Sequence, residues 1–472
     1  MIHIKLERKS STPMIRQIYG GIRAQILSGI IPEGSRLPSS RELAEHLGVS
    51  RNVVMEAFEM LYSEGFTTSR HGSGTYVAPG TSYPVAAVGQ GIQAETVSMG
   101  YESPQGIINF KPGTPDLREF PLRAWLQAVK TAYLHPVNDT MGYGQPEGRR
   151  ELRQAIHDYV VGQRGVACHP DQIIITAGTT QAIGIACHLL LRTRRNVVLE
   201  DPITRDIQLI VRGLGGVIHP TSADDNGMVV DELPEDIQPA FIYVTPSHQF
   251  PLGGTLPIQR RIALLEYAQR TGAYVIEDDY DSEFRFDGPP LSSLHGLAPD
   301  RVVYIGTFSK TLSPALRTGY LILPRTLISE GRGRKWHCDL HNETPTQLAL
   351  ALFITQGGYL RHLARMKRLY AGKRIVVEQA LGENFGDQVQ IMGSATGLHL
   401  AARFIGVDFT SVLLAEIEKS GVRVYPAEAH AIRPGRLGDT LIIGYGNLSE
   451  GQIEQGIRIL GCVMGRKKDT IK

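Results

Sequence analysis

A lysine that follows a short apolar segment is the strongest chemical feature of this sequence. The run Gly-Thr-Phe-Ser-Lys ends at Lys310 and follows a strand predicted over 302–305. A lysine that is partly buried at a strand end has a lowered pKa and can form a Schiff base with an aldehyde. Arg317, seven residues later, has the planar fork that binds phosphate. Most lysines are solvated, so this interpretation needs supporting residues elsewhere in the chain.

An acidic cluster provides the second feature. Four acids occupy the five positions 277–281, directly after the apolar run 274–276. Asp278 could pair with a pyridine nitrogen and keep it protonated, and Tyr280 could donate to an oxygen on the same ring. The alternative is a solvated acidic turn, which the preceding strand disfavours.

A third feature is the start of an apolar helix after the predicted strand 173–176. Gly178 and Thr179 stand at this start, where free backbone N–H groups suit a phosphate. A helix cap without any ligand is the alternative, and the pattern taken alone favours it.

These residues need a scaffold, and the pattern from residue 106 onward predicts one. Short apolar runs alternate with helical patterns. Such alternation is typical of a mostly parallel α/β sheet, in which strand ends meet at one edge. The runs predicted as buried strands are 173–176, 197–199, 241–245, 274–276 and 302–305.

The N-terminal residues predict a different module. Apolar spacing indicates three helices, with a capping box of Ser39 and Glu42 at the second. Thr12 and Ser50 are the expected N-caps of the first and third. A Gly-rich hairpin is expected next, over 66–77. Three helices followed by such a hairpin predict a winged helix-turn-helix.

The third helix would enter the major groove of DNA at its N-terminal end. There Arg51 could read guanine and Asn52 adenine, while Ser50 suits a phosphate oxygen. Arg41 is a further phosphate candidate, and Arg70 and His71 at the hairpin tip could reach the minor groove. The alternative is a helical interaction domain, and the formal net charge of +2 does not decide between them.

Composition limits the remaining possibilities. The chain has 42% hydrophobic and 20% charged residues, and it has neither a bilayer-spanning apolar run nor a secretory signal pattern. Its four cysteines have no metal-ligand or disulfide spacing, so we expect a cytoplasmic protein without a metal site. Residues 79–105 are rich in Gly, Ala, Ser and Pro and carry only two charges, which is typical of a flexible linker.

Together these motifs resemble a known family. Residues 10–78 resemble GntR-type winged-helix domains through the runs at 38–44 and 72–77. The whole chain resembles MocR/GabR-type regulators, in which a linker joins such a domain to a fold-type I aminotransferase-like domain. The run Thr-Pro-Ser-His-Gln-Phe-Pro at 245–251 is the segment most particular to that group. Ordinary aminotransferases have an Asn-Pro-rich motif there.

The resemblance implies pyridoxal 5′-phosphate as the cofactor. Lys310 would form the internal aldimine, Asp278 would pair with the pyridine nitrogen and Tyr280 would bond the ring oxygen. His248 would lie beside the ring, and Tyr143 would reach the site of a second subunit across a homodimer interface. The residues implied at or near the phosphate are Gly178, Thr179, Thr307, Ser309 and Arg317.

One departure concerns the effector. Aminotransferases hold the substrate carboxylate with an arginine just before the Gly-Tyr of the last strand, where this chain has Ile443. Arg205 and Arg433 are the replacement candidates. The missing arginine disfavours the alternative of an active aminotransferase with a fused DNA-binding domain.

The function expected from the sequence is therefore a pyridoxal-phosphate-dependent transcription regulator that binds double-stranded operator DNA. It would sense pyridoxal phosphate itself or a small amino compound, through aldimine exchange at Lys310. Residues 1–78 would be the winged helix, 79–105 the linker and 106–472 the large α/β domain, which includes a smaller C-terminal α+β subdomain. A homodimer is expected, and the linker is long enough, at about 30 Å, for its winged helices to be domain-swapped.

Overall fold

The computed structural model describes residues 2–70, 73–83 and 106–468. The chain divides into two units, Met1–Tyr101 and Glu102–Lys472, which are considered separately below. The predicted linker falls mostly at 84–105, outside the described residues. Within the described part of the chain, no helix is long and apolar enough to cross a bilayer.

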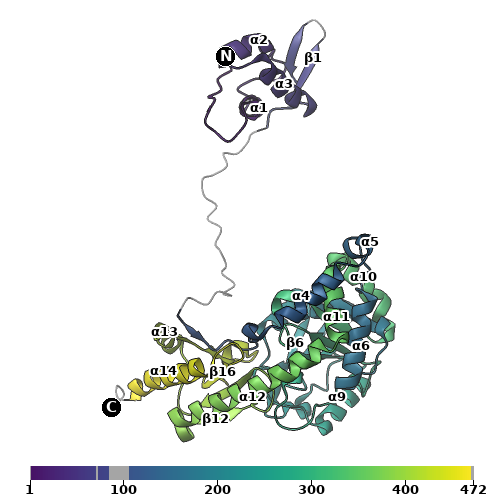
Figure 1. The fold of residues 1–472 in the computed structure, drawn as a ribbon, viewed down its shortest axis with the longest axis vertical. Helices are drawn as coiled ribbons and strands as arrows, with labels where there is room; N and C mark the ends of the chain where they lie inside the picture. The colour runs from purple at the N-terminus through teal and green to yellow at the C-terminus, as the bar shows by residue number, and fades with distance from the viewer. Residues whose placement is uncertain (1, 71–72, 84–105, 469–472) are drawn as a thin grey trace. The chain divides into compact units, whose positions relative to one another are not determined.

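The first unit has the predicted winged-helix order of three helices and a hairpin (Figure 1). Ile18, Ile22 and Val54 are fully buried in its core, as their helical spacing predicts. β1 pairs antiparallel with β2. The elements are α1 (Met14–Leu27), α2 (Ser40–Leu47), α3 (Arg51–Ser63), β1 (Thr67–Arg70) and β2 (Gly74–Val77).

The helix caps of this unit follow the prediction in part. Ser39 Oγ accepts from Glu42 N at 3.2 Å and Glu42 Oε2 accepts from Ser39 N at 2.8 Å, so the capping box forms. The prediction of Thr12 as a cap is wrong, because α1 has Pro13 at its N-cap and no side-chain cap bond. Ser50 does occupy the N-cap of α3, but its side chain makes no cap bond there.

The second unit is built on an eight-stranded sheet in the order β4-β11-β10-β9-β8-β5-β6-β7. β11 runs antiparallel to both of its neighbours and β7 to β6, while the other pairs are parallel. This confirms the predicted mostly parallel α/β sheet. Its strands are β4 (Ile173–Thr176), β5 (Asn196–Asp201), β6 (Val217–Asp224), β7 (Gly227–Met228), β8 (Phe241–Val244), β9 (Tyr274–Asp279), β10 (Val302–Thr307) and β11 (Gly319–Ile322).

Helices cover both faces of this sheet because alternate strand residues point to opposite sides. Ile174 packs with α7 and α8 on one face, whereas Ile173 and Ile175 pack with α4, α6 and α11 on the other. The helices are α4 (Leu122–Ala132), α5 (Val137–Met141), α6 (Arg150–Arg164), α7 (Thr179–Leu190), α8 (Arg205–Gly213), α9 (Ile258–Thr271), α10 (Ile328–Asp339) and α11 (Thr344–Thr355).

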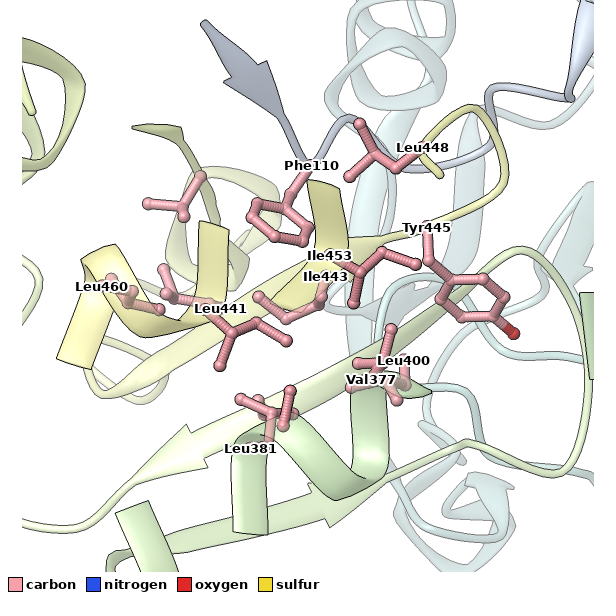
Figure 2. Packing of buried hydrophobic residues seen from close by; sticks show 14 of the residues in the cluster. Phe110, Val377, Leu381, Leu400, Leu441, Ile443, Tyr445, Leu448, Ile453 and Leu460 are labelled. Carbon is pink, nitrogen blue, oxygen red and sulfur yellow. The ribbon is translucent and has the colours of Figure 1, made fainter. Parts of the chain in front are cut away.

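A smaller α+β part completes the second unit. Its core is made by side chains from segments that are far apart in the sequence. Figure 2 shows Phe110, which directly follows β3 near the start of the second unit, beside Ile443 and Ile453. A four-stranded antiparallel sheet has the order β12-β13-β16-β15, and β3 pairs with β14. The elements are β3 (Ile108–Asn109), α12 (Gly358–Phe385), β12 (Val389–Met392), β13 (His399–Phe404), α13 (Ser411–Lys419), β14 (Val422–Arg423), β15 (Tyr425–Pro426), β16 (Thr440–Gly444) and α14 (Glu450–Lys468).

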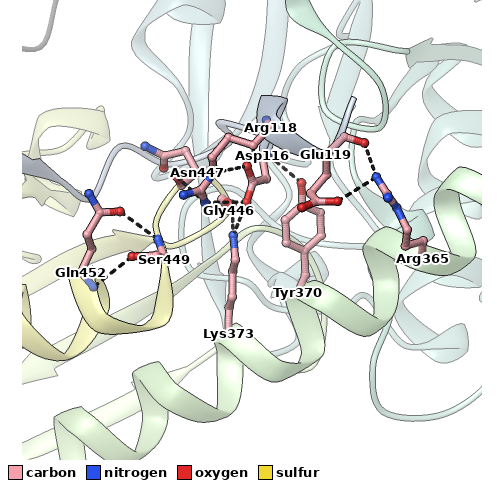
Figure 3. A network of polar contacts seen from close by, with 10 residues as sticks. All are labelled: Asp116, Arg118, Glu119, Arg365, Tyr370, Lys373, Gly446, Asn447, Ser449 and Gln452. Carbon is pink, nitrogen blue, oxygen red and sulfur yellow. Dashed lines mark hydrogen bonds and ion pairs between the residues drawn. The ribbon is translucent and has the colours of Figure 1, made fainter. Parts of the chain in front are cut away.

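A buried polar network fixes the segment that follows β3. Lys373 Nζ of α12 lies 2.8 Å from Asp116 Oδ2 and donates to the carbonyl of Gly446 at 2.6 Å (Figure 3). The backbone N–H of Asp116 donates to the hydroxyl of Tyr370 at 2.9 Å. These bonds tie the segment to α12 and to the loop after β16, and so position the residues just before Asp116.

Candidate functional site

A pocket of about 340 Å³ lies where the parallel strands β8, β9 and β10 end. Ligands of open α/β sheets bind at this edge, because the loops that follow the strands meet there. The predicted residues Lys310, Asp278, Tyr280 and Thr179 all line it. Lining residues that sequence reasoning missed include Lys111, Gly113, Thr180, Phe250 and His399.

Lys310 is held in the pocket three residues after β10. Gly113 covers it closely, since a Cβ atom on Gly113 would lie 3.0 Å from Lys310 Nζ. Desolvation lowers the pKa of the Lys310 ammonium, and the charge of Lys111 lowers it further, while Asp281 and Asp278 oppose the shift. A lysine in this state is suited to attack a carbonyl carbon, as the sequence predicts.

Asp278 is buried on β9 and has one carboxylate oxygen without a partner. The hydroxyl of Tyr243 donates to Oδ2, but Oδ1 makes no hydrogen bond with any described residue. Burial raises the pKa of Asp278 to about 7, and the neighbouring Asp279 adds to the shift. A cationic ring nitrogen beside Oδ1 would satisfy this acceptor and favour the charged carboxylate.

The start of α7 forms a close backbone cradle. Gly178 has φ +95°, and a Cβ atom there would lie 2.9 Å from a guanidinium nitrogen of Arg317. Arg317 itself has φ +45° and donates to the carbonyl of Ala177. A left-handed arginine is uncommon and here aims a cation at the helix start. Nearby, the backbone N–H of Ser309 donates to Thr307 Oγ1 at 3.1 Å.

His248 lies behind the pocket and is not one of its lining residues. Its Nδ1 is 2.9 Å from Asp281 Oδ1, and the hydroxyl of Tyr280 donates to its carbonyl oxygen at 3.0 Å. The pocket wall here is formed instead by Phe250, from the same segment, and by His399 of β13. A histidine in the otherwise apolar run Leu-His-Leu at 398–400 is the signal that could have indicated His399.

The other predicted ligand residues lie elsewhere. Arg205 is exposed at the start of α8 and does not line the pocket, whereas its neighbour Asp206 does. Arg433 forms an ion pair with Asp201 at 2.8 Å and donates to Ser222. Tyr143 is 88% exposed, and its ring makes a T-shaped contact with the ring of His341.

The predicted DNA-contacting residues lie on the surface of the first unit. Four of them are exposed at the N-terminal ends of α2 and α3, namely Arg41, Ser50, Arg51 and Asn52. Arg51 Nε donates to Ser40 Oγ at 3.2 Å, which ties the first turn of α3 to α2. In the hairpin, the Arg70 guanidinium stacks over the Tyr76 ring at 4.7 Å, while His71 lies outside the described residues.

Comparison with known proteins accounts for both units. Residues 14–77 match the family model described as bacterial regulatory proteins, gntR family, and residues 105–454 match aminotransferase class I and II. The probable rhizopine catabolism regulatory protein MocR of Rhizobium meliloti is 34% identical, over 96% of this chain and 94% of its own length. The chain belongs to the MocR-type family.

Two further relatives agree with this membership. The pyridoxine biosynthesis transcriptional regulator PdxR of Corynebacterium glutamicum is 34% identical over 84% of each chain. LysN, an alpha-aminoadipate aminotransferase of Thermus thermophilus, was solved with N-(5′-phosphopyridoxyl)-L-leucine. Its structure superposes with a TM-score of 0.71 at 26% identity, covering 76% of this chain and 92% of LysN. The MocR-type family and the fold class predicted from the sequence are thus confirmed.

Proposed function

We propose that this chain is a transcription regulator that binds operator DNA and holds pyridoxal 5′-phosphate on Lys310. Residues 1–78 would bind DNA, 79–105 would link the parts, and 106–472 would bind the cofactor and the effector. The observation that carries the proposal is that Lys310 and Asp278, whose Oδ1 has no hydrogen-bond partner among the described residues, line one pocket. The gntR-type unit of the same chain supports the regulatory role.

The pocket residues fit this cofactor. Asp278 Oδ1 would accept from the pyridine nitrogen, and Tyr280 would donate to the ring oxygen. The phosphate would lie at the start of α7, held by Gly178, Thr179 and Arg317. Gly178 has no side chain to block the approach to the backbone N–H groups, and Arg317 supplies a cation. Thr307 and Ser309 would complete this end. The bound cofactor would supply an aldehyde carbon and an electron-withdrawing ring.

The effector side of the pocket favours sensing over turnover. No arginine lines it among the described residues, and its cationic side chains are Lys111 and Lys310. A fast aminotransferase needs a fixed carboxylate clamp to orient its substrate. We therefore propose that the effector is pyridoxal phosphate itself or a small amino compound that reacts at the Lys310 position. Arg205 and Arg433 stay candidates for contacts made after rearrangement.

A homodimer is part of the proposal. Large apolar side chains are exposed along the segment that contains α4 and α5. In a monomer this apolar area would stay in contact with water, which is unfavourable, and such patches often mark protein–protein interfaces. Tyr143 follows this segment and is available to a second subunit. The exposed apolar residues are Leu122, Leu126, Leu134, Val137 and Met141.

The visible absorption spectrum tests the proposed function. After pyridoxal phosphate is added to the purified full chain, we expect a visible band and an adduct on Lys310 that borohydride traps. Lys310→Ala should lose both. L- and D-amino acids and GABA are then titrated, and a compound that shifts the band is the effector. A band that none of them shifts indicates sensing of pyridoxal phosphate. No band at all would contradict the proposal.

DNA binding is tested separately by selecting bound duplexes from a random DNA library and measuring their affinity by fluorescence anisotropy. We expect binding whose affinity falls as salt rises, because phosphate contacts release counterions. Addition of the effector should change this affinity, since an effector acts only through its differential affinity for two states. Equal affinity for every duplex, with no sequence enriched from the library, would contradict the regulatory role.

A further inference from the structure

A second group of buried polar residues lies directly behind Tyr280. Asp281 and His248 are 1% and 2% exposed, and both carboxylate oxygens lie near His248 Nδ1, at 2.9 and 3.0 Å. The hydroxyl of Tyr280 is 3.0 Å from the carbonyl oxygen of His248 and 3.1 Å from its Nδ1. One imidazole therefore contacts both the carboxylate and the tyrosine that lines the pocket.

The backbone at Gly397 packs closely against this pair. Gly397 has φ +85°, and a Cβ atom there would lie 2.1 Å from His248 Cε1 and 2.4 Å from Asp281 Oδ2. The hydroxyl of Tyr445 donates to the carbonyl of Gly397 at 2.8 Å and holds this loop down. A side chain at position 397 would collide with both groups, so glycine is needed there for this loop to pack against His248 and Asp281.

The hydrogen-bond geometry assigns the protons. A carboxylate only accepts, so Nδ1 of His248 must carry a proton toward Asp281. Nδ1 then cannot accept from Tyr280, whose hydroxyl proton points to the carbonyl oxygen of His248. Among the described residues, the carbonyl oxygen of His248 is thus the acceptor for the Tyr280 hydroxyl proton. The hydroxyl thus stays a donor that a better acceptor in the pocket can capture.

The surrounding charges support this state. Burial, together with the neighbouring carboxylates, raises the pKa of Tyr280 well above its ordinary value, so its hydroxyl stays protonated. His399 packs on the His248 ring with centroids 4.6 Å apart, and burial keeps its pKa well below the ordinary value. The titratable groups facing His248 are thus Asp281, Tyr280 and a neutral His399, with Lys310 close enough to sense Asp281.

We propose that Asp281 and His248 are positioning residues that hold the Tyr280 hydroxyl as a donor toward the ring oxygen of a bound pyridoxal phosphate. This inference rests on the proposed function. The carboxylate fixes the imidazole, and the protonated Nδ1, 3.1 Å from the Tyr280 hydroxyl, cannot take the proton of that hydroxyl. Asp281 and His248 would thereby influence the pKa of the cofactor–lysine group. A hydrogen-bond donor to the ring oxygen stabilises the unprotonated form of that group and lowers its pKa.

A pH titration of the visible band of the loaded full chain tests the inference. Tyr280→Phe removes the donor, and we expect it to raise the apparent pKa of the band by about one unit, the effect of losing one charge-assisted hydrogen bond. His248→Gln removes the Nδ1 position and should give a shift in the same direction. His248→Asn keeps an N–H near that position and should stay close to the wild type. His295→Gln, at a buried histidine beside Tyr304, is the matched control.

The double variant Tyr280→Phe/His248→Gln separates positioning from a general effect of burial. If His248 acts through Tyr280, the double variant should titrate like Tyr280→Phe alone. The inference would be overturned if the pKa shifts of the two single variants add in the double variant. It would also be overturned if His248→Gln titrates like the wild type, or if His295→Gln gives the same shift as His248→Gln. A wild-type chain without a visible band would instead contradict the proposed function, so the two failures are distinguishable.

Discussion

Replacing Lys373 by methionine should lower the free energy of unfolding of the large unit by about 3 kcal/mol. The side chains of Lys373 and Asp116 are 3% and 4% exposed, and they pair at 2.8 Å. Removing one partner of such a pair costs about 3–5 kcal/mol, because the other charge stays buried without it. Arg118 also pairs with Asp116, at 2.7 Å, so we expect the lower end of that range. Methionine keeps most of the packing of the lysine stem.

Urea unfolding followed by tryptophan fluorescence measures this loss. Trp125 and Trp336 are the two tryptophans of the chain and both lie in the large unit, so the signal reports that unit. The control is Arg118→Met, which removes the other cation from the same carboxylate. Because Arg118 is 57% exposed, its loss should cost less than about 1 kcal/mol. Equal losses for the two variants would refute the argument that burial sets the strength of the pair.

The same pair predicts a pH dependence. Burial opposes ionisation of Asp116, but hydrogen bonds from Arg118 and Lys373 outweigh it and lower the pKa to about 2 from the usual 3.8. The folded-state pKa lies below the unfolded one, so this stabilisation is present above about pH 4 and is lost as the pH falls toward 2. The difference between wild type and Lys373→Met should therefore be constant from about pH 5 to 7 and narrow at lower pH.

Three further predictions concern the two sites. Gly178→Ala should weaken pyridoxal phosphate binding at least tenfold in a fluorescence titration, because the new methyl group meets the Arg317 guanidinium and φ is +95°. Asp278→Asn should stabilise the cofactor-free chain relative to wild type, increasingly as the pH rises from about 4 to about 7 in urea unfolding. The reason is that burial raises the folded-state pKa to about 7, so ionisation costs stability above the unfolded value of 3.8. Arg51→Ala should cost about 1–3 kcal/mol of operator binding and relax selectivity at one base pair, whereas unchanged selectivity would refute its role in base readout.

Local pattern was enough to predict the residues that follow strands. Lys310 and Asp278 each come at or just after an apolar run, and a parallel sheet brings such positions to one edge, where both line the pocket. The capping box at Ser39 was predictable for the same reason, because both partners lie within one helical turn. The cap at Thr12 failed because one residue of offset at a helix start is beyond what spacing can resolve.

The sequence by itself predicted the order of the two modules, the three N-terminal helices and five buried strands of the large sheet, but not β6, β7 or β11. The tertiary structure alone decided which side chains meet in space. Phe250 rather than His248 lines the pocket, and His399 of β13, more than a hundred residues later, lines it too and packs edge to face against the Phe250 ring. The pairing of Asp116 with Lys373 spans 257 positions, and no local periodicity encodes so distant a contact.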